Sequence, residues 1–175
     1  MLDLRDIKAA IAATEEGHAI AAEQRSPYHL SRANVLRVVN QIDADRPEPS
    51  VSAMERALAE HRGTGANYQS SYNISYLALA HARAGEHARA LAVADQAIGD
   101  VERSGERWWQ AEAHRIKGQL LLAAACRREA EECFQTALAC ARRQGARFWE
   151  LQAAQSLAQL WSEHGARARG RDLLG

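Results

Sequence analysis

Three cysteines at regular spacing are the first residues that could do chemistry. Cys126, Cys133 and Cys140 are seven residues apart, and on a helix that spacing separates neighbours by roughly 10.5 Å along the axis. A disulfide needs Cα atoms within about 7 Å, and one zinc ion cannot collect thiolates that far apart. We therefore predict that Cys133 and Cys140 are small buried apolar residues and that they form no metal site.

The seven histidines, at positions 18, 29, 61, 81, 87, 114 and 164, are scattered along the chain. None belongs to an HExxH motif, and no cysteine pair at metal-binding spacing accompanies them. The chain also lacks a GxxxxGK[ST] phosphate loop, a GxGxxG turn and a GxSxG nucleophile elbow. We expect a protein that is not an enzyme and binds no cofactor. The alternative left open is a catalytic set assembled across helices.

The charge and the hydropathy pattern exclude several classes of protein. Lysine plus arginine and aspartate plus glutamate number 22 each, whereas nucleic-acid binders carry a basic excess or stripe that neutralises phosphates. No segment approaches the about 20 apolar residues that cross a bilayer, and the N-terminus lacks the apolar core of a signal peptide. We therefore expect a cytoplasmic protein that binds neither nucleic acid nor membrane, in keeping with its odd number of cysteines.

The sequence repeats with a period of forty residues. Glycines recur at 65, 105 and 145 with Arg25 in the fourth slot, and small residues recur at 78, 118 and 158 with Val38 in the fourth. A further register holds the aromatic residues Tyr28, Tyr68, Trp108 and Phe148. Independent registers that agree over most of the chain predict a repeat array, with a half-unit 1–24, units 25–64, 65–104 and 105–144, and an incomplete unit 145–175.

Each unit is expected to fold as two helices, because Ala, Leu, Glu, Gln and Arg dominate and β-branched residues are sparse. The three prolines, at 27, 47 and 49, lie between the apolar-periodic segments. Glycine at 65, 105 and 145 suits a left-handed cap at the end of a second helix, and the aromatic residue after it is expected to wedge between units. The predicted helices span 5–23, 27–44, 50–63, 67–84, 87–103, 108–124, 127–144, 147–164 and 167–174.

The two ends of the array are expected to expose apolar surface. The chain begins with a second helix and ends with an incomplete one, so Ile7, Ile11 and Ile20 at one end and Leu173-Leu174 at the other would lack a covering unit. Terminal repeats need polar caps for solubility. The prediction is self-association through one of these ends as a two-fold homodimer.

One unit carries the pattern Ala130, Phe134, Ala137 and Leu138, preceded by Gly118. This pattern resembles the tetratricopeptide repeat, whose unit is about 34 residues, so a period of forty implies longer helices. "SGERWWQAEAHRIKGQLLLA", "AEECFQTALACARRQGARFWELQAAQSLAQLW" and "RARGRDLL" resemble the C-terminal helical arms of large bacterial signalling proteins. In those proteins a STAND-type ATPase or a class III nucleotide cyclase precedes the repeats. The resemblance covers roughly residues 14–174 and implies an all-α, right-handed solenoid of antiparallel helix hairpins.

The resemblance also implies a binding surface, because first helices line the concave face of tetratricopeptide arrays. Tyrosine, arginine and glutamine side chains are suited to gripping a peptide there, and the alternative is that they are only the solvated sides of helices. Alignment on the small-residue register places on this face Arg32, Tyr72, Ser75, Arg83, Glu112, Arg115, Gln119, Gln152, Gln155 and Gln159.

The function expected from these features is a non-enzymatic arm that binds a protein segment or mediates assembly in a signalling complex. The alternative is an arm that senses a small-molecule effector and controls an attached ATPase or cyclase. A deep apolar pocket with a few convergent polar groups would favour the sensor, and an open polar groove would favour protein binding.

Overall fold

The computed structural model describes residues 4–44, 51–66, 69–163 and 167–174 of the chain. Within these ranges all regular structure is helical and no strand occurs, so the all-α prediction is confirmed. Tyr68, Pro47 and Pro49 lie outside the described residues. The helices are α1 (Leu4–Glu23), α2 (Pro27–Asp43), α3 (Val51–Gly63), α4 (Ser70–Arg83), α5 (His87–Ser104), α6 (Gln110–Ala123), α7 (Arg127–Gln144), α8 (Arg147–Glu163) and α9 (Arg167–Leu174).

Two helices begin later than expected. The segment predicted to start a helix at 108 opens with a short 3-10 turn, η1 (Arg107–Trp109), and α6 follows at Gln110. The helix predicted from 67 begins at Ser70, because the preceding Gln69 has a left-handed backbone with φ 59°. A residue in that conformation cannot continue a right-handed helix.

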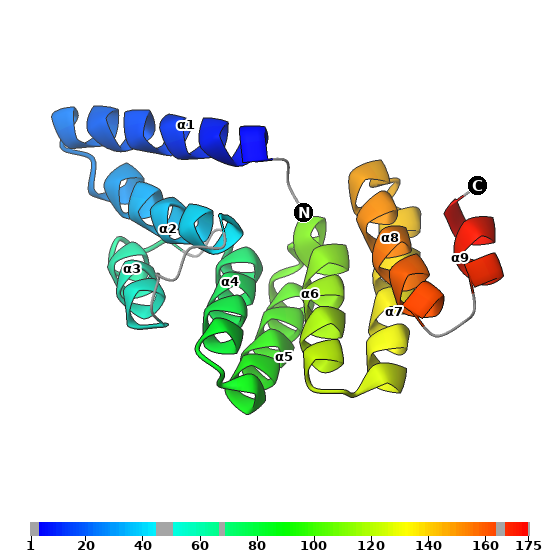
Figure 1. Cartoon of the computed structure of the whole chain (residues 1–175). Helices are drawn as coiled ribbons and strands as arrows, with labels where there is room; N and C mark the ends of the chain where they lie inside the picture. The colour runs from blue at the N-terminus through cyan, green and yellow to red at the C-terminus, as the bar shows by residue number, and fades with distance from the viewer. Residues whose placement is uncertain (1–3, 45–50, 67–68, 164–166, 175) are drawn as a thin grey trace.

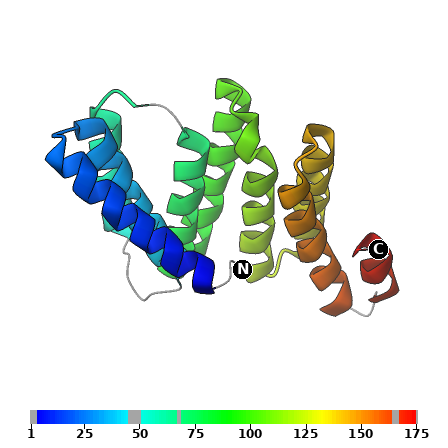
Figure 2. The ribbon, with the colours of Figure 1, turned by 90° about the horizontal axis from the view of Figure 1, so that it is seen from above.

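The helices follow one another along the molecule, with α1 at one end and α9 at the other (Figures 1 and 2). Each packs against the next in sequence, and the alternate helices α2, α4, α6 and α8 also contact one another in turn. Among the described residues, α3, α5 and α7 make no comparable contacts with each other. We call α2, α4, α6 and α8 the first helices, and α3, α5 and α7 the second helices.

The core is continuous along this row of helices. One buried cluster extends from Val35 in α2 to Leu120 in α6, and a second joins α6, α7 and α8 around Phe134 and Leu157. Gly118 of α6 packs directly on Phe134 of α7, where an added Cβ would lie 2.5 Å from the ring. The small residue predicted at this register is therefore required by close helix packing.

Left-handed backbone conformations occur at the predicted caps. Gly65, Gly105 and Gly145 have φ of 81°, 73° and 64°, and Arg25, in the fourth slot of the same register, has φ 51°. The backbone amides of Gly105 and Gly145 donate to carbonyls in the last turns of α5 and α7. The glycines at 65, 105 and 145 thus cap the ends of helices, as predicted.

The two ends of the chain are better covered than expected. Ile7 is buried and Ile11 is half-buried, because α1 packs along α2, and Ile20 stays exposed. At the other end Leu173 packs, half-buried, against the core around Phe134. The exposed apolar surface at the two ends is therefore smaller than predicted. The homodimer stays a prediction.

Candidate functional site

All ten residues predicted for the binding face lie on first helices. Arg32 is on α2, Tyr72, Ser75 and Arg83 are on α4, and the rest are on α6 and α8. Neighbouring first helices contact one another, so residues that are far apart in sequence lie on adjoining helices. We call the surface formed by the accessible residues of these four helices the first-helix face. Eight of the ten predicted residues are exposed or half-buried there, whereas Ser75 and Glu112 are buried.

Arg32 and Tyr72 form one of the contacts between α2 and α4. The guanidinium of Arg32 lies over the Tyr72 ring, 5.4 Å from its centroid, and its Nη1 donates to Asn73 Oδ1 at 3.3 Å. Burial raises the pKa of Tyr72 to about 12, against the opposing effect of Arg32. The phenol therefore keeps its proton at neutral pH and can donate a hydrogen bond.

A chain of aromatic rings joins α4, the start of α6 and α8. Trp109, at the start of α6, meets Tyr72 of α4 edge-on at 4.8 Å and Trp149 of α8 edge-on at 5.1 Å between ring centroids. Trp109 is 5% exposed, whereas its neighbour Trp108 is 39% exposed. The wedge between units was predicted for the aromatic register of Trp108 and Phe148. The structure corrects this in part: Trp108 does stack on Tyr72 at 6.0 Å between centroids, but the residue that follows, Trp109 or Trp149, is the more deeply buried.

Ser75 is a correction to the predicted site. It is 1% exposed, and its hydroxyl donates to the carbonyl of Ser71 and accepts from the Trp109 indole Nε1 at 3.1 Å. A partner cannot reach it. Ser75 instead orients Trp109 and so belongs to the joint between units.

Glu112 and Arg115 pair with each other on α6. Glu112 is 7% exposed, and its two oxygens accept from Arg115 Nε at 2.6 Å and Nη2 at 2.5 Å. Burial disfavours the charged guanidinium, but the contact with Glu112 outweighs it and the pKa of Arg115 is raised. This bidentate geometry is the one in which arginine frequently binds a carboxylate. A carboxylate for Arg115 is thus already supplied from inside the chain.

Asp43 and Tyr76 also join α2 to α4, and neither was among the residues predicted for the site. The Tyr76 hydroxyl donates to both oxygens of Asp43, at 3.1 and 3.2 Å, from α4 to the end of α2. Burial raises the pKa of Asp43, and the hydrogen bond from Tyr76 and the charge of Arg83 only partly offset it. One available signal was the spacing of Tyr72 and Tyr76, which places both rings on one side of a helix.

The glutamines continue the face toward the C-terminus. Gln119 and Gln155 are exposed and Gln152 is half-buried. Gln119 of α6 and Gln159 of α8 line a hollow of about 180 Å³ with Phe134 and Leu160 among its lining residues. The amide of Gln159 donates to Glu163 at 3.0 Å. This part of the face offers amide donors and acceptors beside a small hollow whose lining is partly polar and partly apolar.

The cysteines and histidines show no sign of metal chemistry in the described part of the chain. Cys140 is buried, as predicted, but Cys133 is only half-buried, and burial raises the pKa of its thiol. No group of three histidine, cysteine or acidic side chains comes together there at metal-binding distance. No described helix is long and apolar enough to cross a membrane.

Comparisons with known proteins add no relative. No model of a protein family matches the chain, and no curated protein matches it. The resemblance to tetratricopeptide arrays therefore stays a prediction from the sequence.

Proposed function

We propose that the chain is a right-handed, tetratricopeptide-like solenoid with a period of about forty residues, which binds a protein segment on its first-helix face. The observation that carries the proposal is the contact between successive first helices, and its support is that Arg32, Tyr72, Gln119 and Gln155 lie on these adjoining helices. The absence of comparable contacts between the described second helices supports placing that side on the inside of a curve. The four caps spaced by forty residues support the period.

The groups that remain accessible on the face define the partner's chemistry. Arg32 and Tyr72 are half-buried, and Arg83, Gln119, Gln155 and Gln159 are exposed. Glutamine amides both donate and accept, and therefore suit the backbone of an extended segment. With Glu112 and Arg115 already satisfied by each other, an uncharged or mixed segment fits better than a strongly acidic one.

Selection from a display library of random peptides tests this function. Peptides selected on the whole chain should lose at least about tenfold in affinity when Gln119, Gln155 and Gln159 are all changed to alanine, a loss of about 1.4 kcal/mol. The matched control changes the exposed glutamines of second helices, Gln96 and Gln135, to alanine. Equal binding to both variants would place the binding site elsewhere.

A small-molecule sensing arm is the second candidate function. The observation that favours it is a cavity of about 640 Å³ between the ends of α5 and α7 and the start of α6. That volume lies in the range of small-ligand sites. The apolar lining expected for a typical small-molecule site is absent, because most residues around this cavity are polar or charged.

The setting that we propose is a signalling assembly in the cytoplasm, in which the chain is the interaction arm. Its support is the resemblance of residues 14–174 to the repeat arms of STAND-type ATPases and class III cyclases. Self-association through the α1 end, where Ile20 is exposed, belongs to the same proposal. Light scattering checks it: the wild type should be a dimer and Ile20→Lys a monomer, and a monomeric wild type would contradict it.

A further inference from the structure

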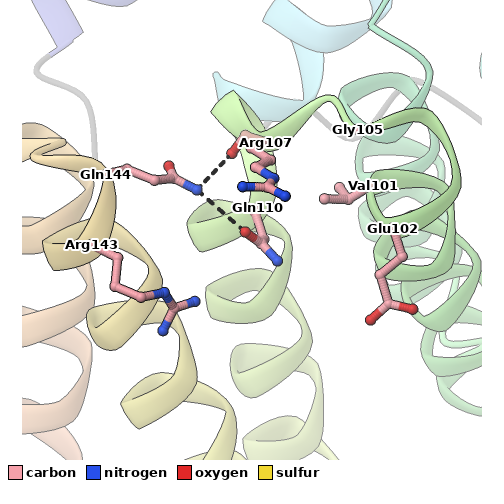
Figure 3. A pocket seen from close by; sticks show the side chains of 7 residues that line it. All are labelled: Val101, Glu102, Gly105, Arg107, Gln110, Arg143 and Gln144. Carbon is pink, nitrogen blue, oxygen red and sulfur yellow. Dashed lines mark hydrogen bonds between the residues drawn. The ribbon is translucent and has the colours of Figure 1, made fainter.

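The cavity of about 640 Å³ has walls of opposite chemical character. Glu102 enters it from α5, Arg107 and Gln110 from η1 and the start of α6, and Arg143 from α7 (Figure 3). None of the ten residues predicted for partner binding lines it. It is therefore a separate site, whose behaviour is independent of the first-helix face.

The hydrogen bonds in the cavity fix the direction of two amides. Gln144 Nε2 donates to the main-chain carbonyl of Arg107 at 3.0 Å and to Gln110 Oε1 at 3.3 Å. A main-chain carbonyl only accepts, so the group of Gln144 that faces it is the nitrogen, and Gln110 must turn its oxygen toward that nitrogen. The NH₂ of Gln110 then points away from Gln144, as Figure 3 shows. One amide donor is thus held in place, and no described residue accepts a hydrogen bond from it.

Two guanidinium groups complete a wall of donors. In the described part of the chain, neither Arg107 nor Arg143 pairs with a carboxylate, and Arg143 Nη2 donates to the Cys140 sulfur at 3.1 Å. Arginine and amide donors together suit a carboxylate or phosphate group. The start of α6 adds the positive end of a helix dipole, which also favours an anion.

The opposite wall of the cavity carries hydrogen-bond acceptors. Glu102 lies in the last turn of α5, and the carbonyls at the end of that helix carry the negative end of its dipole. No described residue forms an ion pair with Glu102, whereas the neighbouring Arg103 pairs with Asp100 at 3.0 Å. A carboxylate at a helix C-terminus is unfavourable by itself, and a bound amine would relieve that.

We infer that this cavity binds a small zwitterionic molecule, with its acidic group at Arg107, Gln110 and Arg143 and its amine at Glu102. The cavity volume suits a small ligand rather than a folded partner. The inference names the ligand class for the second candidate function, and it stands or falls independently of the first-helix face.

The test is a titration of the whole chain with simple probes, followed by NMR of the Gln110 side-chain NH₂ and the Arg107 Nε. The probes are aminohexanoate and phosphoethanolamine as carboxylate and phosphate zwitterions, and hexanoate and hexylamine as single-charge controls. At least one zwitterion should shift both signals saturably and bind more tightly than hexanoate or hexylamine, by about threefold or more, the size of one partly exposed ion pair. Which zwitterion binds identifies the acidic group.

Matched variants locate the site. Arg143→Gln should weaken the zwitterion by about tenfold, because it removes a charge-assisted contact. Its neighbour Arg142, also in the last turn of α7, pairs with Glu150 at 3.0 Å. Arg142→Gln should therefore leave the affinity for the zwitterion unchanged. Glu102→Gln should reduce the affinity for aminohexanoate to that for hexanoate. The inference is overturned if neither zwitterion shifts the signals, if hexanoate or hexylamine binds as tightly as the better zwitterion, or if both arginine variants act alike. A failure here leaves the peptide-selection result untouched.

Discussion

His61 illustrates how a pair with catalytic potential can be purely structural. It is 2% exposed, and its Nδ1 lies 3.0 Å from Ser31 Oγ. A serine beside a histidine suggests a nucleophile and its base. However, the Ser31 hydroxyl already donates to the carbonyl of Tyr28 at 2.8 Å, so the imidazole must donate to it. The buried pair joins α2 to α3 and activates nothing.

The pH dependence of stability should report on this histidine. Burial, and then the charge of Arg32, lower the pKa of His61 below its ordinary value of 6.5. As the pH falls below 6.5, His61 binds a proton in the unfolded chain but not in the folded chain. The free energy of unfolding therefore decreases. One such proton changes it by at most about 1.4 kcal/mol per pH unit.

The measurement is urea unfolding of the wild type and His61→Gln, from about pH 7.5 down to about pH 5.5, the interval in which histidine titrates. The difference between the two proteins isolates His61 from His114, whose pKa is also lowered by burial. We expect the wild type to lose more stability than the variant over this interval. Parallel curves would show that His61 does not titrate as the structure requires.

Ser75 shows why single residues of the site were hard to assign from the sequence. It lies between Tyr72 and Tyr76, and a serine at such a position is usually exposed. Helix α4 contacts α2, α3, α5 and α6, so nearly all of its circumference is covered and its apolar period is weak. The sequence could place Ser75 on the correct helix but could not say which neighbour it faces. Asp43 was missed because its partner Tyr76 comes from the next unit.

At the scale of the element, helix boundaries were predictable where caps are local. Ser26 and Pro27 start α2 as expected, although the Ser26 hydroxyl contacts His29 Nδ1 at 2.8 Å instead of capping a backbone amide. The ends of α5 and α7 follow from Gly105 and Gly145. The 3-10 turn before α6 was not predictable, because it depends on where the Trp109 ring is held by α4.

The packing of α6 on α7 gives a test of the small-residue register. In Gly118→Ala the new Cβ would lie 2.5 and 2.7 Å from two ring carbons of Phe134, a ring that is buried and cannot swing away. Alanine favours a helix by about 1 kcal/mol over glycine, but overpacking costs about 1–3 kcal/mol. We expect a net loss of about 1 kcal/mol in the free energy of unfolding, measured by urea denaturation.

Two further variants control this result. Gly99 lies inside α5, and an added Cβ there meets nothing within 4 Å, so Gly99→Ala should stabilise the chain by up to about 1 kcal/mol. Phe134→Leu should cost less in the Gly118→Ala background than in the wild type, because it relieves the clash. If Gly118→Ala stabilises the chain as Gly99→Ala does, the close contact with Phe134 is not present.

At the scale of the molecule, the order of the helices could be predicted from the sequence. Arg32, Tyr72 and the glutamines lie on the helices on which the predicted forty-residue register placed them. The cavity lined by Arg107, Gln110 and Arg143 was not predictable. It forms where loops and helix ends of two units meet, and the register says nothing about the space between them.

The central claim is that the first-helix face binds a protein segment, and hydrogen exchange on the whole chain with a selected peptide tests it most directly. The account predicts slower amide exchange on binding in α2, α4, α6 and α8, with α3, α5 and α7 unchanged. Peptide binding adds protection where it orders or covers the backbone. Protection concentrated in the second helices, or around Glu102 and Arg143 at the ends of α5 and α7, would contradict the claim.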